Sequence, residues 1–299
     1  MSEHLLGEVD ALDGRGGSTI EPRDVVRVTG PDTARYLQGQ LSQDVVAMAD
    51  ASTWTFVLEP SGRVDAWFRV HRSSDDEYLL EIEAGWGDAL LARMRRFLLR
   101  TKTEFGDVEQ RWLVRRRWSP SIVRIAEAPA GALAAPAIGP GEAGIDLLFE
   151  FEADAVANAV DRVSDAAGER HRIAHGIVRM GRELTDATIP AEAGQWVIDR
   201  SVNFTKGCYT GQELVARIDS RGAAVPRPVR LLSCAEADLE PGDLLVDDAV
   251  TLTITSAVPR LDQRPSLALA IVPRSIEPGR VVRAADGIAV LVTDPPASA

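Results

Sequence analysis

Apolar and polar residues follow two different patterns along the chain, and the change falls near Pro226. Before Pro226, runs with the period of a strand are mixed with apolar stripes at helical spacing. The strongest stripe predicts an amphipathic helix over 86–99, with Leu90, Leu91, Met94, Phe97 and Leu98 on one face. Helices are also predicted over 31–45 and from Asp154, a favourable N-cap residue. Strands are predicted at 24–29, 54–58, 64–70, 78–82, 112–117, 121–125, 145–151 and 170–179.

After Pro226 only short β-like runs remain, separated by turn residues. They cover 229–233, 244–246, 250–257, 267–272, 280–283 and 288–292. Such a series predicts a small β-barrel or sandwich. Residues 126–144 are rich in Ala, Gly, Pro and Glu and predict a surface loop, and 185–200 is predicted to be irregular. The whole pattern indicates an α+β fold.

The 299 residues are enough for two or three domains with a buried core. No apolar run reaches the roughly 20 residues that a membrane-spanning helix needs. Residues 1–17 are polar and contain no apolar signal core. We therefore expect a cytoplasmic protein.

A net charge of −12 disfavours nonspecific binding to nucleic acid. Cations nevertheless gather locally, at Arg93, Arg95, Arg96, Arg100 and Lys102 and then at Arg111, Arg115, Arg116 and Arg117. They are typical of a solvated face. The functional alternative is a rim that attracts an anion, such as a glutamate tail or a phosphate.

Cys208 and Cys234 are the only cysteines. Two cysteines exclude a disulfide framework, a cysteine-rich zinc site and an iron–sulfur cluster held by four thiolates of one chain. His171 and His175 are four residues apart and could share a helix face. A surface pair explains them better than a metal site, so no metal is expected.

The most informative stretch is 205–213, Thr-Lys-Gly-Cys-Tyr-Thr-Gly-Gln-Glu. Thr210 and Glu213 have the spacing of a capping box, which predicts a helix start just after Cys208. The helix N-terminus and the charge of Lys206 would both favour the thiolate. The simpler alternatives are a cysteine that serves as a small buried hydrophobe, and glycines that mark a tight turn.

The string Lys206-Gly207-Cys208-Tyr209-Thr210-Gly211-Gln212-Glu213 resembles the motif of YgfZ-type proteins, folate-binding relatives of the glycine-cleavage T-protein (aminomethyltransferase). Weaker similarity to the family extends over most of 20–235, at Val28–Asp32, Tyr36–Leu41, Asp44–Val45, Leu58–Arg63, Arg96–Lys102 and Gly181–Glu192. The resemblance implies a T-protein-like α+β fold with two interleaved α/β lobes built on ferredoxin-like sheets and a C-terminal β-barrel. Lobe A would be 1–50 and 118–225, lobe B 51–117 and the barrel 226–299.

The resemblance also implies a tetrahydrofolate site. Asp65 falls near the T-protein aspartate that helps to activate the folate nitrogen. Arg179 stands where T-proteins carry a pterin-binding glutamate, and this departure weakens the carry-over of their chemistry. Glu192 is then the best remaining carboxylate, and Trp196 is expected to wall the pocket, although a tryptophan is more often a core residue. In the motif, Lys206 would stabilise a reactive Cys208 anion, Gly207 and Gly211 would allow close backbone approach, and Tyr209 and Gln212 would shape the wall.

Three functions follow from these features. In the favoured one, a folate-binding accessory protein supports iron–sulfur enzymes through Cys208, and thereby tRNA modification, without binding nucleic acid tightly itself. The second is a tetrahydrofolate-dependent aminomethyltransferase or demethylase with Asp65 as the polar catalyst. The third is a redox-sensing thiol protein that does not bind folate.

Overall fold

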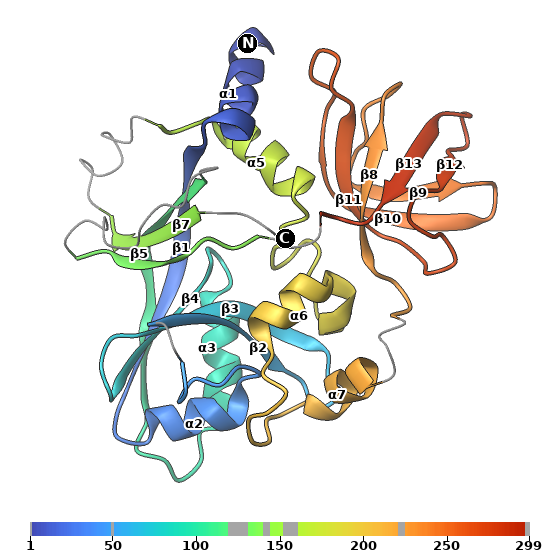
Figure 1. Ribbon diagram of the computed structural model, residues 1–299. Coiled ribbons are helices and arrows are strands. Elements are labelled where there is room, and N and C mark those ends of the chain that lie inside the picture. Colours follow the sequence, from blue (N-terminus) through green and yellow to red (C-terminus); the bar gives the residue numbers. More distant parts are fainter. Residues whose placement is uncertain are drawn as a thin grey trace.

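The computed structural model describes residues 2–48, 51–118, 131–139, 144–151, 161–220 and 225–296. Two antiparallel sheets dominate it, one formed by the strands up to residue 150 and one by the strands from residue 229 on (Figure 1). In that view the second sheet stands beside the helices α5, α6 and α7. The predicted α+β class is confirmed.

The first sheet has seven strands in the order β2-β3-β4-β1-β5-β7-β6. Their bounds are β1 Gly17–Thr29, β2 Ser52–Leu58, β3 Val64–Arg72, β4 Glu77–Glu83, β5 Glu104–Trp118, β6 Leu133–Pro136 and β7 Gly144–Glu150. Two of them, β1 and β5, pair with each other along almost their whole length. Register shifts between Arg23 and Val25 and between Val26 and Val28 interrupt that pairing. Such irregularities bend and twist a sheet, so each half of the long pair carries its own set of neighbours.

The β1–β5 pair has a different neighbouring strand along each of its two halves. The second half of β1, from Arg23 to Thr29, pairs with β4, while the second half of β5, from Trp112 to Trp118, pairs with β7. Strand β1 belongs to the predicted lobe A and β4 to the predicted lobe B, so the strands of the two lobes form one continuous sheet. The residue bounds of the lobes stay a prediction.

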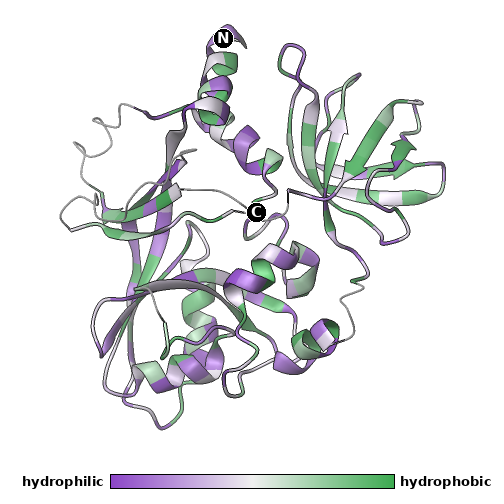
Figure 2. Cartoon of the chain, viewed as in Figure 1, coloured by the Kyte–Doolittle hydropathy of each residue, from purple (hydrophilic) through white to green (hydrophobic). Residues whose placement is uncertain are grey.

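Helices cover this sheet. They are α1 Ser2–Gly14, α2 Thr33–Gln40, α3 Gly87–Arg96, α5 Asp165–Ala174, α6 Gln195–Ser201 and α7 Gln212–Ser220, with a short 3₁₀ helix η2 at Pro190–Ala193. The largest core cluster joins β2, β3 and β4 to α2, α3 and α6, and Trp67 lies fully buried within it. Figure 2 shows apolar residues along these strands and on the helix faces turned toward them. A smaller cluster, which includes Val9, Leu12 and Ala167, packs α1 on α5.

The second sheet has the order β12-β13-β8-β11-β10-β9. Its strands are β8 Val229–Cys234, β9 Gly242–Val246, β10 Val250–Val258, β11 Ser266–Ile271, β12 Val281–Arg283 and β13 Ala289–Thr293. The two edge strands meet through a bridge between Val246 and Ala284. This bridge closes the sheet around its own core cluster and confirms the predicted C-terminal barrel.

Four local predictions were wrong. The run 126–144 was predicted as a surface loop, but it contains β6, and Ala135 and Ile138 are buried. The run 170–179 was predicted as a strand, but α5 covers its first half because Ser164 Oγ accepts the Ala167 N–H and caps the helix. The run 185–200 contains η2 and α6 and is not wholly irregular. Phe97, predicted on the buried face of the 86–99 helix, follows α3 and is 40% exposed. The predictions for 121–125 and for a helix from Asp154 lie outside the described residues.

Candidate functional site

The loop that carries Cys208 begins where α6 ends. Asn203 Oδ1 accepts the backbone N–H groups of Thr205 and Lys206 at 2.8 and 2.9 Å, which fixes the turn into the motif. Cys208 follows on the surface with an exposed side chain, whereas Cys234 is buried in the barrel. The alternative that Cys208 is a buried core residue is therefore wrong.

Lys206 ties the motif to the end of α2. Its Nζ donates to the carbonyl oxygens of Gln38, Leu41 and Gln43 at 2.7, 2.6 and 3.0 Å. These bonds use all three ammonium donors, and carbonyls at a helix C-terminus favour such a cation. Burial lowers the pKa of Lys206 to about 8, and the charge of Asp44 opposes the shift. Lys206 thus supplies positive charge to the loop while its hydrogen bonds go to α2.

Gly62 and Gly211 are distant in the sequence but pack closely together in the fold. Gly211 has a φ of +80°, and a Cβ added there would lie 2.4 Å from the carbonyl oxygen of Glu59. Gly62, in the turn between β2 and β3, has a φ of +84°, and its added Cβ would lie 2.5 Å from Leu214 Cβ. The turn at Gly62 therefore lies so close to the start of α7 that neither position 62 nor position 211 has room for a Cβ atom. A Cβ at Gly207 would meet nothing within 4 Å.

Tyr209 and Gln212 order the start of α7. Tyr209 is buried, its N–H donates to Gln212 Oε1 at 3.2 Å, and burial raises its pKa to about 12. Lys206 Nζ lies 5.2 Å from the centre of its ring. Because α7 begins at Gln212, Gly211 and not Thr210 precedes the helix, so the predicted capping box was wrong. The predicted helix itself is confirmed.

Asp65 lies near the start of β3, and its side chain is 21% exposed. Its Oδ2 accepts a hydrogen bond from Arg93 Nε on α3, and Arg93 Nη2 donates to the carbonyl oxygen of Leu58 at 2.7 Å. The sequence analysis placed Arg93 in a basic rim and missed this pair. The helical pattern of 86–99 could have indicated this pair, because it places Arg93 among the buried residues of the helix.

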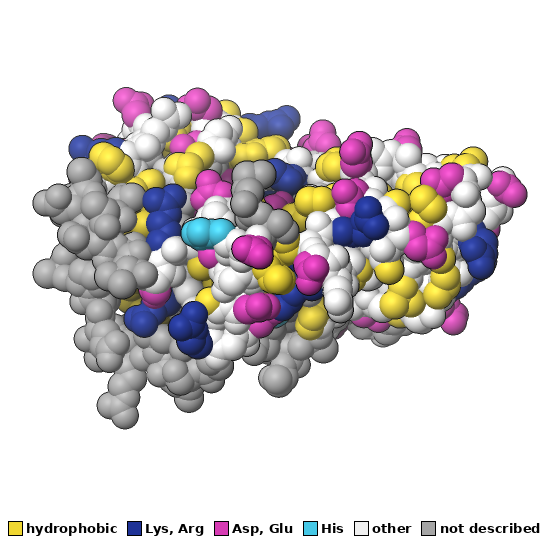
Figure 3. All heavy atoms as spheres, turned by 90° about the horizontal axis from the view of Figure 1, so that it is seen from above, with side chains coloured by type: hydrophobic (Ala, Val, Ile, Leu, Met, Phe, Trp, Pro, Cys, Tyr) yellow, Lys and Arg dark blue, Asp and Glu magenta, His cyan; other side chains and the backbone are white. Residues whose placement is uncertain are grey.

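The other arginines of that rim are largely paired as well. Arg116 is buried against Asp146, while Arg115 and Arg117 both contact Asp161. Figure 3 shows acidic and basic side chains interspersed over one face of the molecule.

Glu192 and Trp196 lie close together on η2 and α6. Glu192 Oε2 accepts the Ile189 N–H at 3.2 Å, and its Oε1 is 3.9 Å from Arg227 Nε. Burial raises the pKa of Glu192, although that hydrogen bond and the charge of Arg227 oppose the shift. Trp196 lines a cavity of about 440 Å³ between α6, the start of β8 and residues 294–296. Its indole Nε1–H has no hydrogen-bond partner, and neither has Arg230 Nε–H in the same wall.

Arg179 lies elsewhere, in a second cavity of about 430 Å³. Its guanidinium binds Glu21 on β1. Although burial opposes ionisation of Glu21, the charges of Arg116, Arg179 and Arg23 hold its pKa below the usual range. The structure thus separates the predicted site residues into the anchored thiol loop, the Asp65–Arg93 pair, Glu192 beside Arg227, the Trp196 cavity and the Arg179 cavity. Cys208 is not among the residues that line either cavity.

His171 lies on α5 and His175 is the C-cap residue of that helix, with ring centroids 4.1 Å apart. His171 is buried, so the predicted surface pair was wrong. Within the described ranges, no group of three or more His, Cys, Asp or Glu side chains is arranged to hold a metal ion. In the same ranges, no helix is both long and apolar enough to cross a membrane.

No protein-family model matches the sequence. The chain is 30% identical over 230 residues to the iron-sulfur cluster assembly factor IBA57 homolog, mitochondrial, of Mycosarcoma maydis, a match that covers 71% of this chain and 56% of the relative. It is 25% identical over 296 residues to the tRNA-modifying protein YgfZ of Aliivibrio fischeri, covering 91% and 89%. The chain thus spans little more than half the length of the mitochondrial relative.

Among solved structures, the chain matches the glycine cleavage system aminomethyltransferase T of Bartonella henselae with a TM-score of 0.76. The match covers 98% of this chain and 89% of that chain, at 16% identity, and at this identity it shows the fold alone. The fold is therefore that of aminomethyltransferase T. The chain is a relative of the YgfZ and IBA57 proteins, as the cysteine motif predicted.

Proposed function

We propose that this protein is a folate-binding accessory protein that supports iron–sulfur enzymes and, through them, tRNA modification. The observation that carries the proposal is the exposed thiol of Cys208 on a loop fixed by Lys206, Asn203 and the Gly211–Gly62 contact. A reactive side chain works best when the residues around it hold it rigidly and a substrate can still reach it. Relatives named for iron–sulfur cluster assembly and for tRNA modification support this choice.

In this proposal Cys208 accepts or relays a group, or is a transient ligand of a client's cluster. The mixed surface charge and the net charge of −12 support an effect on tRNA that acts through another enzyme. The expected cytoplasmic location stays a prediction.

Complementation of a bacterial strain that lacks its own YgfZ-type protein tests the role of the sulfur. Cys208→Ser should abolish rescue of an iron–sulfur enzyme's activity, whereas Cys234→Ser, the same change at a buried cysteine of the barrel, should preserve it. Equal amounts of folded protein are confirmed by circular dichroism. Full rescue by Cys208→Ser would remove the assigned role.

For the folate, we propose that the pterin lies in the cavity beside Trp196. The volume of about 440 Å³ is that of a small-molecule site, and the flat indole, Pro295 and Pro296 offer apolar surface to a ring. The unpartnered Nε1–H of Trp196 suits a ring acceptor, and the Nε–H of Arg230, whose Nη1 pairs with Asp294, suits a carboxylate of the tail. Glu192, on the adjoining η2, is the nearest predicted carboxylate.

Calorimetric titration with 5-formyl-tetrahydrofolate tests this site. Trp196→Phe keeps the aromatic ring and removes one donor, so we expect about fivefold weaker binding, the equivalent of about 1 kcal/mol for one net hydrogen bond. Trp118→Phe is the matched control, because Trp118 Nε1 is also buried without a partner but lies outside the cavity. An absence of binding to the unaltered protein would favour the redox-thiol alternative, for which the exposed Cys208 is the supporting observation.

The aminomethyltransferase fold favours a second candidate, one-carbon transfer to tetrahydrofolate with Asp65 as the polar catalyst. The ion pair with Arg93 fixes the orientation of Asp65, but it also occupies the Oδ2 atom of the carboxylate. Incubation with aminomethyl-loaded lipoyl carrier protein and tetrahydrofolate decides between the candidates. Methylene-tetrahydrofolate formed at a catalytic rate, and lost in Asp65→Asn, would make this the primary function.

A further inference from the structure

The Arg179 cavity contains a buried ion pair whose groups are only partly used. Arg23, on β1, is 2% exposed, and its Nε donates to Glu81 Oε1 at 2.9 Å. Its Nη1 lies 4.0 Å from Glu83 Oε1, but Nη2 has no hydrogen-bond partner. Glu83 Oε2 has none either, and nor has the Thr19 hydroxyl, although Thr19 is 3% exposed. Buried polar atoms are nearly always satisfied, so a donor and acceptors left open in one cavity wall indicate a missing ligand.

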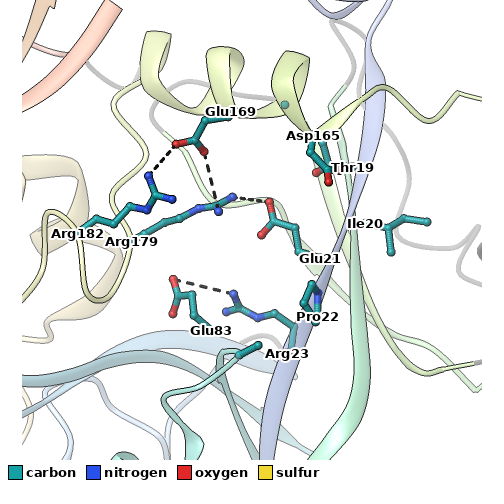
Figure 4. A pocket seen from close by; sticks show the side chains of 12 residues that line it. Thr19, Ile20, Glu21, Pro22, Arg23, Glu83, Asp165, Glu169, Arg179 and Arg182 are labelled. Carbon is teal, nitrogen blue, oxygen red and sulfur yellow. Dashed lines mark hydrogen bonds and ion pairs between the residues drawn. The ribbon is translucent and has the colours of Figure 1, made fainter. Parts of the chain in front are cut away.

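The opposite wall carries guanidinium groups. Arg179 and Arg182 both point toward Glu169 on α5 (Figure 4), at 4.0 and 3.3 Å. The same carboxylate also receives two hydrogen bonds of 2.8 Å from Arg172. Three guanidinium groups therefore contact Glu169, of which Arg179 also binds Glu21 and Arg172 also binds Glu183. Among the three, Arg182 is bonded, within the described residues, to Glu169 alone.

The wall formed by Arg23 offers one open donor and one open acceptor, Arg23 Nη2 and Glu83 Oε2. Figure 4 shows the two walls facing each other, with Arg23 and Glu83 below and Arg179 and Arg182 above. A ligand that carries charges of one sign alone could use only one of these two open groups. A ligand with one charge of each sign would be attracted by both.

We propose that this cavity binds a small zwitterion of the free α-amino acid type. Its ammonium group donates to Glu83 Oε2, and its carboxylate accepts from Arg23 Nη2 and the guanidinium of Arg179. The volume of about 430 Å³ holds such a molecule with water around it. The residues that line this cavity are different from those that line the Trp196 cavity, so the proposed folate site and this site are separate.

Ligand-observed NMR with the full chain and each of the standard L-amino acids tests the proposal, followed by calorimetry on the amino acids that bind. At least one should bind, and its N-acetyl form and its methyl ester, which each lack one of the two charges, should bind at least tenfold more weakly. Glu83→Gln should weaken binding of the free amino acid at least tenfold. Glu77→Gln, at the other end of β4, is the matched control and should leave the affinity unchanged.

A second variant guards against a folding defect in Glu83→Gln. Ala84 is exposed at the cavity wall, so Ala84→Leu should leave the fold intact and obstruct binding. Binding of none of the amino acids would overturn the proposal, as would equal affinity for the N-acetyl form. Competition by 5-formyl-tetrahydrofolate would also overturn it, because the cavity would then belong to the folate site. Complementation by the protein should not depend on Glu83, which separates this test from that of Cys208.

Discussion

A methyl group added at Gly211 should damage the candidate site, whereas the same change four residues earlier should not. In Gly211→Ala the new Cβ would lie 2.4 Å from the Glu59 carbonyl oxygen and 2.8 Å from Leu58 Cβ. Carbon and oxygen normally approach to about 3.3 Å at the closest, and the nearest obstacle is backbone, which cannot rotate away. The positive φ adds its own strain for an L-residue.

The size of the effect follows from these two contributions. A left-handed conformation costs about 1–2 kcal/mol for alanine, and overpacking of a close contact costs about 1–3 kcal/mol. We therefore expect Gly211→Ala to lower the free energy of unfolding by about 2–5 kcal/mol. Gly207→Ala meets no atom within 4 Å and should change it by less than about 0.5 kcal/mol, or raise it slightly through the unfolded chain.

Urea denaturation followed by circular dichroism measures the stability, and the rate of Cys208 alkylation in native buffer measures the order of the loop. Gly211→Ala should shift both, because the contact with the turn at Gly62 positions the start of α7. A loss of stability that is equal in the two variants would refute the reasoning. A Gly211→Ala protein as stable as the unaltered one would refute it as well.

Two further predictions concern other parts of the chain. Burial would raise the pKa of Glu81, but Arg23 and the hydrogen bond from His71 hold it well below the usual range. Because the folded pKa lies below the unfolded value of about 4.3, the stabilisation is present above that pH and is lost as the pH falls below it. Glu81→Gln should cost about 3–5 kcal/mol at pH 7 and flatten the acid limb of stability measured in urea from pH 6 to pH 3, whereas unchanged steepness would contradict the assignment. Iodoacetamide should modify the exposed Cys208 in the folded protein, but the fully buried Cys234 only after unfolding. Peptide mass spectrometry measures both rates, and equal rates of modification in the folded protein would contradict the burial of Cys234.

Much of the fold could be predicted from local pattern. Short apolar runs bounded by turn residues located β2, β3 and β4, which are buried on both faces for most of their length. The six strands of the barrel were located in the same way, and in β10 and β13 buried positions alternate with more exposed ones. The run 170–179 failed because its apolar residues suit either a strand or a helix. The deciding contact, the Ser164 cap, lies outside the run.

In the candidate site, too, the sequence predicted the features that adjacent residues encode and missed those that depend on distant contacts. The sequence identified Cys208 and the helix after it, since a motif of adjacent residues needs no tertiary information. It treated Gly207 and Gly211 alike, because spacing cannot show which glycine the Glu59 carbonyl approaches. It also assigned Lys206 to the thiol, whereas its three hydrogen bonds go to carbonyls more than 160 residues earlier.

The sequence by itself determined the class of fold, the C-terminal barrel and the residue that presents the thiol, because periodicity and adjacent residues encode these features locally. Only the tertiary structure decided that Asp65 is held by Arg93, that Arg179 and Trp196 line different cavities, and that Arg23 and Glu83 share a cavity with Arg179 and Arg182. Each of these depends on contacts between elements far apart in the chain. Burial and the charge of a partner set what such a side chain can do, and neither is fixed until the sheets and helices have packed.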